Sequence, residues 1–121
     1  TFGGNPLACS VANKVIEIIS KKSFLSDLNQ KATFFVNKLE EIKNTYNDLI
    51  DEIRGRGFLL GIKCKISNSI FIEKLRNNGL LVVGANESVI RILPPLNVTM
   101  KDLKIALKII EKTCIGINSK R

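Results

Sequence analysis

The chain has 121 residues, 45% of them apolar, and a formal net charge of +8 at pH 7. These values predict one folded domain with a modest core and exclude extended disorder. The longest apolar runs are far shorter than the roughly 20 residues that a membrane span needs, so we expect no contact with a membrane.

The sequence also argues against several kinds of site. The three cysteines, Cys9, Cys64 and Cys114, lie far apart without metal-ligand spacing, and the chain has no histidine. We therefore expect no metal site and no disulfide, but buried free thiols in a reducing compartment. Basic residues are scattered among acidic ones, as on a solvated surface, which disfavours a nucleic-acid partner. No basic and apolar leader opens the sequence, so we expect a cytoplasmic protein.

A helix is predicted over residues 6–20. Gly3 and Gly4 permit a turn, Asn5 suits the N-cap, and Pro6 suits the first helical position. Because the free N–H groups at a helix start attract anions, this run is also a candidate site for a phosphate-sized group. Apolar residues then recur at spacings of three and four, which gives the helix one stripe to pack on another surface.

A second, longer helix is predicted from Ser23, and a pair of strands follows it. Residues 49–54 partly alternate, and residues 58–66 are rich in strand-forming side chains. Between them, Gly55 and Gly57 have a spacing that is weak evidence for phosphate binding, because a dinucleotide loop opens a helix and this one opens a strand. The two glycines therefore predict a tight turn.

The rest of the chain predicts a helix, two more strands and a last helix. The first three of these elements cover residues 69–77, 80–83 and 89–93. Gly79 is a natural stop for the helix. Thr99 and Asp102 resemble a capping box that starts the last helix, and Gly116 is expected to close it.

The resulting order is helix, helix, strand, strand, helix, strand, strand, helix. It predicts an α+β fold, with a small, mostly antiparallel sheet of three to four strands, helices on one of its faces, and two helices ahead of it.

Arg91 is the sharpest candidate for a binding residue beyond the first eight positions. It has apolar neighbours on both sides, and strand alternation places it on the face of Val89 and Leu93. We therefore expect a partly buried guanidinium, which needs an anion. Its planar fork suits a carboxylate, which can come from a ligand or from an acidic residue of the chain itself.

Three segments of the chain resemble class-III, fold-type I pyridoxal-phosphate (PLP) aminotransferases, above all the acetylornithine and ornithine members. They are T-F-G-G-N-P-L-A at residues 1–8, an R-G-x-G-L-L-x-G-like run from Arg54, and R-x-x-P-P-L from Arg91. The resemblance covers only the C-terminal part of the family's chain. It implies that residues 1–20 are the active-site loop and connecting helix, and that residues 21–121 are the C-terminal small domain.

The resemblance also implies roles for individual residues. The hydroxyl of Thr1 would reach the PLP phosphate of the neighbouring subunit in a homodimer. Arg91 would bind the α-carboxylate of the amino-acid or keto-acid substrate. The implied reaction moves the ω-amino group of acetylornithine, ornithine or succinylornithine to 2-oxoglutarate in arginine metabolism.

No catalytic residue is assigned within the chain. In the family the Schiff-base lysine lies upstream of the threonine, and no lysine here matches it. Lys63 and Lys65 occupy alternate positions of a predicted edge strand, where a solvated side chain is expected. The chain therefore resembles a fragment, and we expect it to have no transaminase activity and to bind no PLP by itself.

Two further expectations concern partners. The stripe of the first helix would lie exposed in the isolated chain, which predicts a dimer or a domain-swapped oligomer. The alternative function is a non-enzymatic, basic α+β module that binds nucleic acid or protein. Against nucleic acid, the one tyrosine and six phenylalanines lie at core-like spacings and form no stacking platform on the strands.

Overall fold

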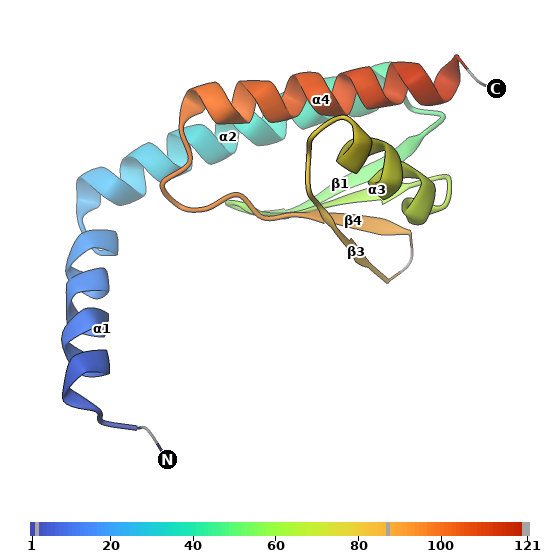
Figure 1. Ribbon diagram of the computed structural model, residues 1–121. Helices are drawn as coiled ribbons and strands as arrows, with labels where there is room; N and C mark the ends of the chain where they lie inside the picture. Colours follow the sequence, from blue (N-terminus) through green and yellow to red (C-terminus); the bar gives the residue numbers. More distant parts are fainter. Residues whose placement is uncertain (2, 87, 120–121) are drawn as a thin grey trace.

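The computed structural model describes residues 1, 3–86 and 88–119. The described elements are α1 (Pro6–Ile19), α2 (Lys22–Thr45), β1 (Ile50–Arg56), β2 (Leu59–Cys64), α3 (Asn68–Asn77), β3 (Val83–Ala85), β4 (Val89–Ile92) and α4 (Met100–Asn118), as Figure 1 shows. This order and the α+β fold class agree with the predictions. Phe2, within the first motif, lies outside the described residues, as does Glu87, between the predicted strands at 80–83 and 89–93.

The four strands form one antiparallel sheet in the order β1-β2-β4-β3. β2 and β4 are therefore the inner strands, although α3 and β3 separate them in the sequence. β1 and β2 follow each other in the sequence and form one hairpin, and β3 and β4 form another. The prediction that Lys63 lies on an edge strand is wrong, because β2 pairs on both sides.

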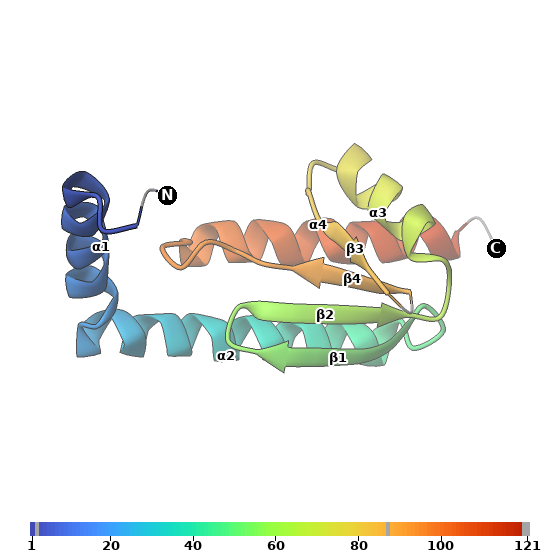
Figure 2. The same ribbon diagram turned by 90° about the horizontal axis from the view of Figure 1, so that it is seen from below.

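One face of the sheet is covered by helices and the other is not. α2 and α4 contact each other and run side by side over the same face (Figure 1). Seen from below, the strands lie in front of these helices (Figure 2). The core between the two layers includes Phe35, Leu39, Ile62, Ile90, Leu103 and Ile110. Burial of these side chains is the main source of stability, at about 25 cal/mol per Å² of apolar surface removed from water.

α3 fastens the β3–β4 hairpin to the rest of the domain. The amide Nδ2 of Asn68 donates to the carbonyl oxygens of Ala85 at 3.1 Å and Val89 at 3.0 Å. At the other end of α3, Asn78 donates to the buried hydroxyl of Thr113 on α4 at 3.0 Å. These bonds fix the position of the hairpin that carries Arg91.

The turn between β1 and β2 requires glycine, as predicted. Gly55 has φ +125° and Gly57 has φ +60°. An ideal Cβ on Gly55 would lie 2.1 Å from the carbonyl oxygen of Leu59, so the paired strand leaves no room for any side chain there.

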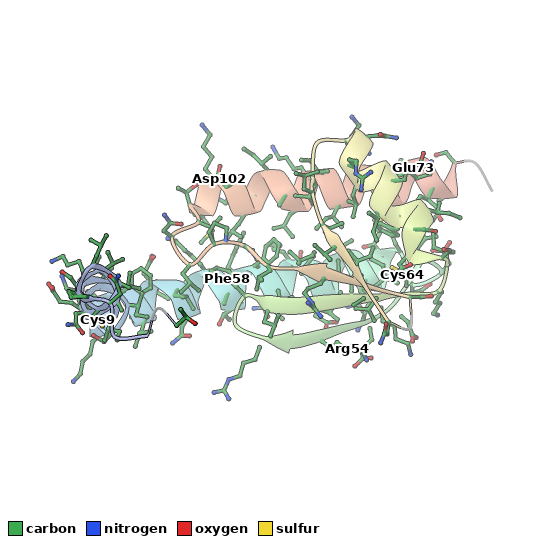
Figure 3. The ribbon with its side chains drawn as sticks, turned by 60° about the horizontal axis from the view of Figure 1, so that its bottom comes forward. Cys9, Arg54, Phe58, Cys64, Glu73 and Asp102 are labelled. Carbon is green, nitrogen blue, oxygen red and sulfur yellow. The ribbon has the colours of Figure 1, made fainter. Side chains whose placement is uncertain are left out.

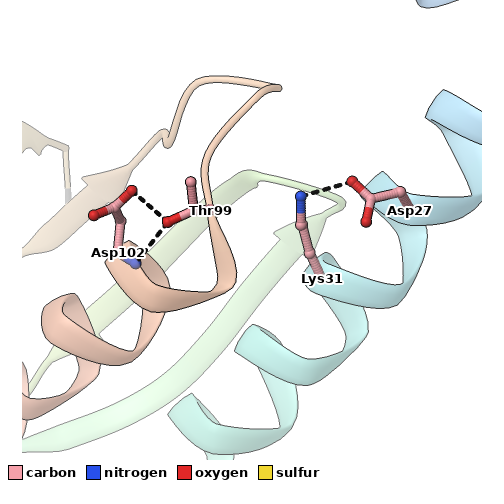
Figure 4. A network of polar contacts seen from close by, with 4 residues as sticks. All are labelled: Asp27, Lys31, Thr99 and Asp102. Carbon is pink, nitrogen blue, oxygen red and sulfur yellow. Dashed lines mark hydrogen bonds and ion pairs between the residues drawn. The ribbon is translucent and has the colours of Figure 1, made fainter.

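The last helix starts where the sequence predicts and ends later. Thr99 caps α4: its hydroxyl oxygen accepts from the Asp102 N–H at 3.1 Å, and the hydroxyl also donates to the Asp102 carboxylate at 2.6 Å (Figure 4). However, Gly116 does not close the helix, which continues to Asn118. The apolar contacts of Ile117 with the core favour this continuation over a glycine stop.

β3 also differs from the prediction. It covers Val83–Ala85, whereas a strand is expected at residues 80–83. The ladder with β4 pairs Val83 with Arg91 and Ala85 with Val89, so the hairpin begins and ends later than the apolar run. Leu80 and Val82 instead pack against the core from a loop. No helix in the described part of the chain is both long and apolar enough to cross a membrane.

Candidate functional site

The uncovered face of the sheet carries a row of side chains that includes Arg91. Arg54 on β1 pairs with Gly61 on β2, Gly61 pairs with Arg91 on β4, and Arg91 pairs with Val83 on β3. Residues that are paired across strands point to the same face. The two arginines therefore stand on either side of a glycine.

Arg91 is exposed, so the expectation of a partly buried guanidinium is wrong for this chain. Alternation does separate it from Ile90 and Ile92, which point into the core. The face that it shares with Leu93 has no helix over it, and Leu93 itself is 65% exposed. Within the part of the chain that the structure describes, no acidic side chain forms an ion pair with Arg91.

A shallow hollow of about 240 Å³ lies on this face. Its lining includes Arg54, Gly61, Val89 and Arg91. Two guanidinium groups at one hollow make it attractive to a carboxylate, because the planar fork of arginine can donate two parallel hydrogen bonds to that group. A larger hollow of about 790 Å³ runs along α2, and no residue of the three sequence motifs lines it.

Arg54 is the residue of this hollow that sequence reasoning did not single out. In the sequence, Arg54 is only the first residue of the R-G-x-G-L-L-x-G-like run and has no predicted binding role. The signal that could have found it is its register, because Ile53 faces the helices and the alternation puts Arg54 on the opposite face. That face becomes a shared site only once β4 pairs with β2, which the sequence alone does not reveal.

The start of α1 differs from the predicted anion site. Asn5 caps the helix as expected, and its Oδ1 accepts from the N–H groups of Leu7 at 3.0 Å and Ala8 at 3.2 Å. These two donors are thus satisfied within the chain and are not presented to a phosphate. Thr1 is exposed, and its hydroxyl can still donate to a phosphate oxygen.

The structure does not bring Thr1 and Arg91 together. α1 extends away from the sheet (Figure 1), and no residue of its helix lines the hollow beside Arg91. Any site that uses both residues therefore needs other polypeptide between or around them.

No lysine among the described residues is buried, as a lysine activated by desolvation would be. Lys63 lies on the uncovered face, where its Nζ is 2.9 Å from Oδ2 of Asp51. The hydrogen bond and the charge of this pair raise the pKa of Lys63 and lower the pKa of Asp51. An amine held in its charged form is a poor nucleophile, so Lys63 is a poor candidate for a Schiff-base lysine.

The cysteines follow the predictions in part. All three are free, and Cys64 and Cys114 are buried, but Cys9 on α1 is exposed. The expectation of a buried thiol is therefore wrong for Cys9, because α1 has no buried residue. Within the described ranges, no cluster of cysteine, aspartate or glutamate could hold a metal ion.

Comparisons with known proteins place the chain among transaminases. The family model for class-III aminotransferases matches residues 1–114. The acetylornithine aminotransferase of Bacillus cereus is 44% identical over 112 residues, which are 93% of this chain and 29% of that protein.

Solved structures give the same result. The crystal structure of acetylornithine aminotransferase from Elizabethkingia anophelis superimposes with a TM-score of 0.86 at 32% identity, over 96% of this chain and 30% of that one. The structure of ornithine aminotransferase from Toxoplasma gondii, described with partial occupancy of PLP at its active site, superimposes with a TM-score of 0.89 at 29% identity. The match covers 99% of this chain and 29% of that one.

The chain thus spans about 30% of the length of the relatives that it matches. These matched proteins are all aminotransferases, so the comparisons give no support to the alternative of a basic binding module. The shared fold, the family model across nearly all of the sequence and the three motifs agree: the chain belongs to the class-III aminotransferase family.

Proposed function

We propose that this chain is the C-terminal segment of a PLP-dependent transaminase of arginine metabolism. The enzyme would transfer the ω-amino group of N-acetylornithine, or of ornithine or succinylornithine, to 2-oxoglutarate. The observation that carries the proposal is the 44% identity to an acetylornithine aminotransferase across 93% of the chain. The uncovered, arginine-bearing sheet face is where such an enzyme would place a carboxylate substrate.

In this proposal Arg91 binds a carboxylate of the amino-acid or keto-acid substrate. Its exposure follows from the uncovered sheet face, and a part of the enzyme outside this segment, which is 29% of the matched relative, would cover that face. Once covered, the guanidinium would be desolvated, and a charge-assisted bond to a carboxylate would strengthen as the local dielectric constant falls.

The residues of this chain that would hold PLP are few. The hydroxyl of Thr1 would donate a hydrogen bond to the phosphate of PLP bound by the neighbouring subunit, because the first amides of α1 are already bonded to Asn5. PLP, when bound, supplies the electron sink and the amino-group carrier of transamination. The lysine that transamination also needs would come from other polypeptide, so the isolated chain would be inactive.

The proposal includes the assembly and the location of the enzyme. Because Thr1 would act on the cofactor of a neighbouring subunit, the working enzyme would be a homodimer. A cytoplasmic location fits the two buried free thiols, which a reducing compartment preserves.

A segment exchange tests the proposed function. Residues 1–121 replace the matching segment of the Bacillus cereus acetylornithine aminotransferase, and transamination between N-acetylornithine and 2-oxoglutarate is measured. The chimera should be active, and Arg91→Gln in it should lower kcat/KM for 2-oxoglutarate about 30-fold or more, because losing a desolvated carboxylate contact costs about 2 to 5 kcal/mol.

The matched control is Lys104→Gln, which removes one positive charge from the exposed side of α4. It should leave kcat/KM unchanged within about twofold, since exposed charges far from a site contribute little. A folded chimera that binds PLP but has no turnover would overturn the proposed function.

A further inference from the structure

Gly61 is a glycine at a position where a strand normally gains from a side chain. It lies in β2, an inner strand, between partners on β1 and β4. Its φ is not in the left-handed region, so its backbone conformation is open to any residue. Glycine inside a strand weakens it and often marks a close approach by another group. Space, and not conformation, therefore explains the glycine.

Two side chains use the room above Gly61. An ideal Cβ on Gly61 would lie 3.0 Å from Cγ1 of Val89, 3.5 Å from Cγ of Arg54 and 3.8 Å from Nε of Arg54. The aliphatic part of the Arg54 side chain therefore extends from β1 over the inner strand β2. The Nε of its guanidinium lies above β2, and Arg54 lines a hollow together with Arg91 of β4.

Both arginines line the same hollow of about 240 Å³, with Gly61 in its floor. Arg54 also takes part in another interaction within the structure, so the inference concerns where its side chain lies and not an unused charge. Two guanidinium groups around one hollow can each receive one carboxylate of the same molecule.

We propose that Gly61 is a positioning residue, which lets Arg54 lie across β2 so that Arg54 and Arg91 together bind a molecule with two carboxylate groups. This inference rests on the carboxylate role of Arg91 in the proposed function. It adds a second arginine and the glycine that places it.

Binding to the 121-residue chain tests the pair of arginines. Amide chemical shifts are followed by NMR during titration with glutarate, which has two carboxylates, and with acetate, which has one, at equal ionic strength. Glutarate should bind with the lower dissociation constant. Arg54→Gln and Arg91→Gln should each weaken glutarate binding about twofold to fivefold, the range for exposed charge pairs. The matched control Arg76→Gln, on α3, should have no effect.

A double-variant cycle tests the role of Gly61. Gly61→Val should weaken glutarate binding as much as Arg54→Gln does, and the variant with both changes should be no weaker than either alone. Gly61→Ser replaces the valine variant if that variant is unfolded. The Cβ position is already 3.5 Å from Cγ of Arg54, so an atom beyond it competes with Arg54, while the Cβ itself needs a shift of only a few tenths of an ångström in Val89. Unchanged shifts of core residues on α2 and α4 show that the fold is intact.

Three results would overturn the inference. The first is that the parent chain and Arg54→Gln bind glutarate equally well. The second is that the effects of Gly61→Val and Arg54→Gln on glutarate binding are additive. The third is that the parent chain shows no saturable binding of glutarate. None of them decides the proposed function, because the activity of the Bacillus cereus chimera is measured separately. Conversely, an inactive chimera leaves the titration of this chain as an independent test of Gly61.

Discussion

The three thiols of the chain have very different surroundings. Cys9 is exposed on α1, whereas Cys64 on β2 and Cys114 on α4 are buried beneath the sheet and the helices. Figure 3 shows Cys9 well separated from Cys64, at the other end of the molecule. Their reactivities should differ accordingly, because a thiol reagent must reach the sulfur and the thiol must ionise.

The first prediction concerns thiol labelling. At neutral pH, a disulfide reagent such as 5,5′-dithiobis(2-nitrobenzoic acid) should modify Cys9 rapidly and the other two thiols only after unfolding. The absorbance released is measured with and without urea. Cys9→Ser should lose the rapid phase and keep the slow one. Rapid modification of a second thiol in the folded chain would contradict the buried positions of Cys64 and Cys114.

The second prediction concerns alkaline pH. Burial raises the pKa of the Cys64 and Cys114 thiols from 9.0 to about 12. The unfolded chain therefore loses these protons above pH 9, while the folded chain keeps them up to about pH 12. The stabilising contribution is complete below pH 9 and is lost as the pH rises toward 12. The free energy of unfolding should fall by up to about 1.4 kcal/mol per pH unit for each thiol.

Urea unfolding between pH 8 and pH 11 measures this dependence. Cys114→Ala should reduce the downward slope with pH, whatever it does to the stability at pH 8. Cys9→Ala is the matched control, because its thiol is exposed, and it should keep the parent slope. An unchanged slope in Cys114→Ala would show that the buried thiol does not contribute.

At the scale of elements, the β1–β2 hairpin provides the third prediction. Gly55→Ala should destabilise the chain by about 2 kcal/mol or more, because the new Cβ meets the Leu59 carbonyl and φ is +125°. Gly57→Ala has open space around it and φ +60°, so it should cost about 1 kcal/mol. Denaturant unfolding of both variants gives the difference, and equal losses would contradict the close approach at Gly55.

Helices were easier to predict than strands because their signals are local. The Asn5 cap of α1 and the Thr99 cap of α4 depend on residues within one helical turn. β3 depends instead on pairing with β4, so the apolar run at residues 80–83 gave the wrong boundaries. Gly116 was overridden by tertiary packing in the same way, since Ile117 continues the buried face of α4.

The candidate site was predictable only in part for a related reason. Alternation correctly separates Arg91 from Ile90 and Ile92, but it does not say whether a layer covers the other face. Here no layer does, so Arg91 is exposed. The neighbourhood of Arg54, Gly61 and Arg91 arises from the strand order, which joins segments 30 residues apart and has no signature in either segment.

At the scale of the whole molecule, α1 stands apart from the domain. None of its residues is buried, and its apolar stripe includes Leu7 at 75%, Val11 at 57% and Val15 at 47% exposure. An exposed stripe of this kind is a surface for association. The fourth prediction is that the isolated chain forms dimers or larger oligomers, as measured by light scattering over a range of concentrations.

Val11→Ser combined with Val15→Ser should shift the chain toward the monomer, because both changes fall on the stripe. Asn13→Ser, a polar change elsewhere on the same helix, should leave the oligomeric state unaltered. A monodisperse monomer of the parent chain at high concentration would contradict the prediction.

The strand order also has a consequence for synthesis on the ribosome. When β2 leaves the ribosome, only β1 is available to pair with it. The other edge of β2 stays unpaired until β4 has been synthesised, after α3 and β3. At 5–20 residues per second, that delay lasts about one to six seconds. During it, the nascent hairpin presents an open edge that can recruit a second chain. Polysome crowding should therefore affect the yield of this polypeptide more than it affects a domain whose strands pair in the order of translation.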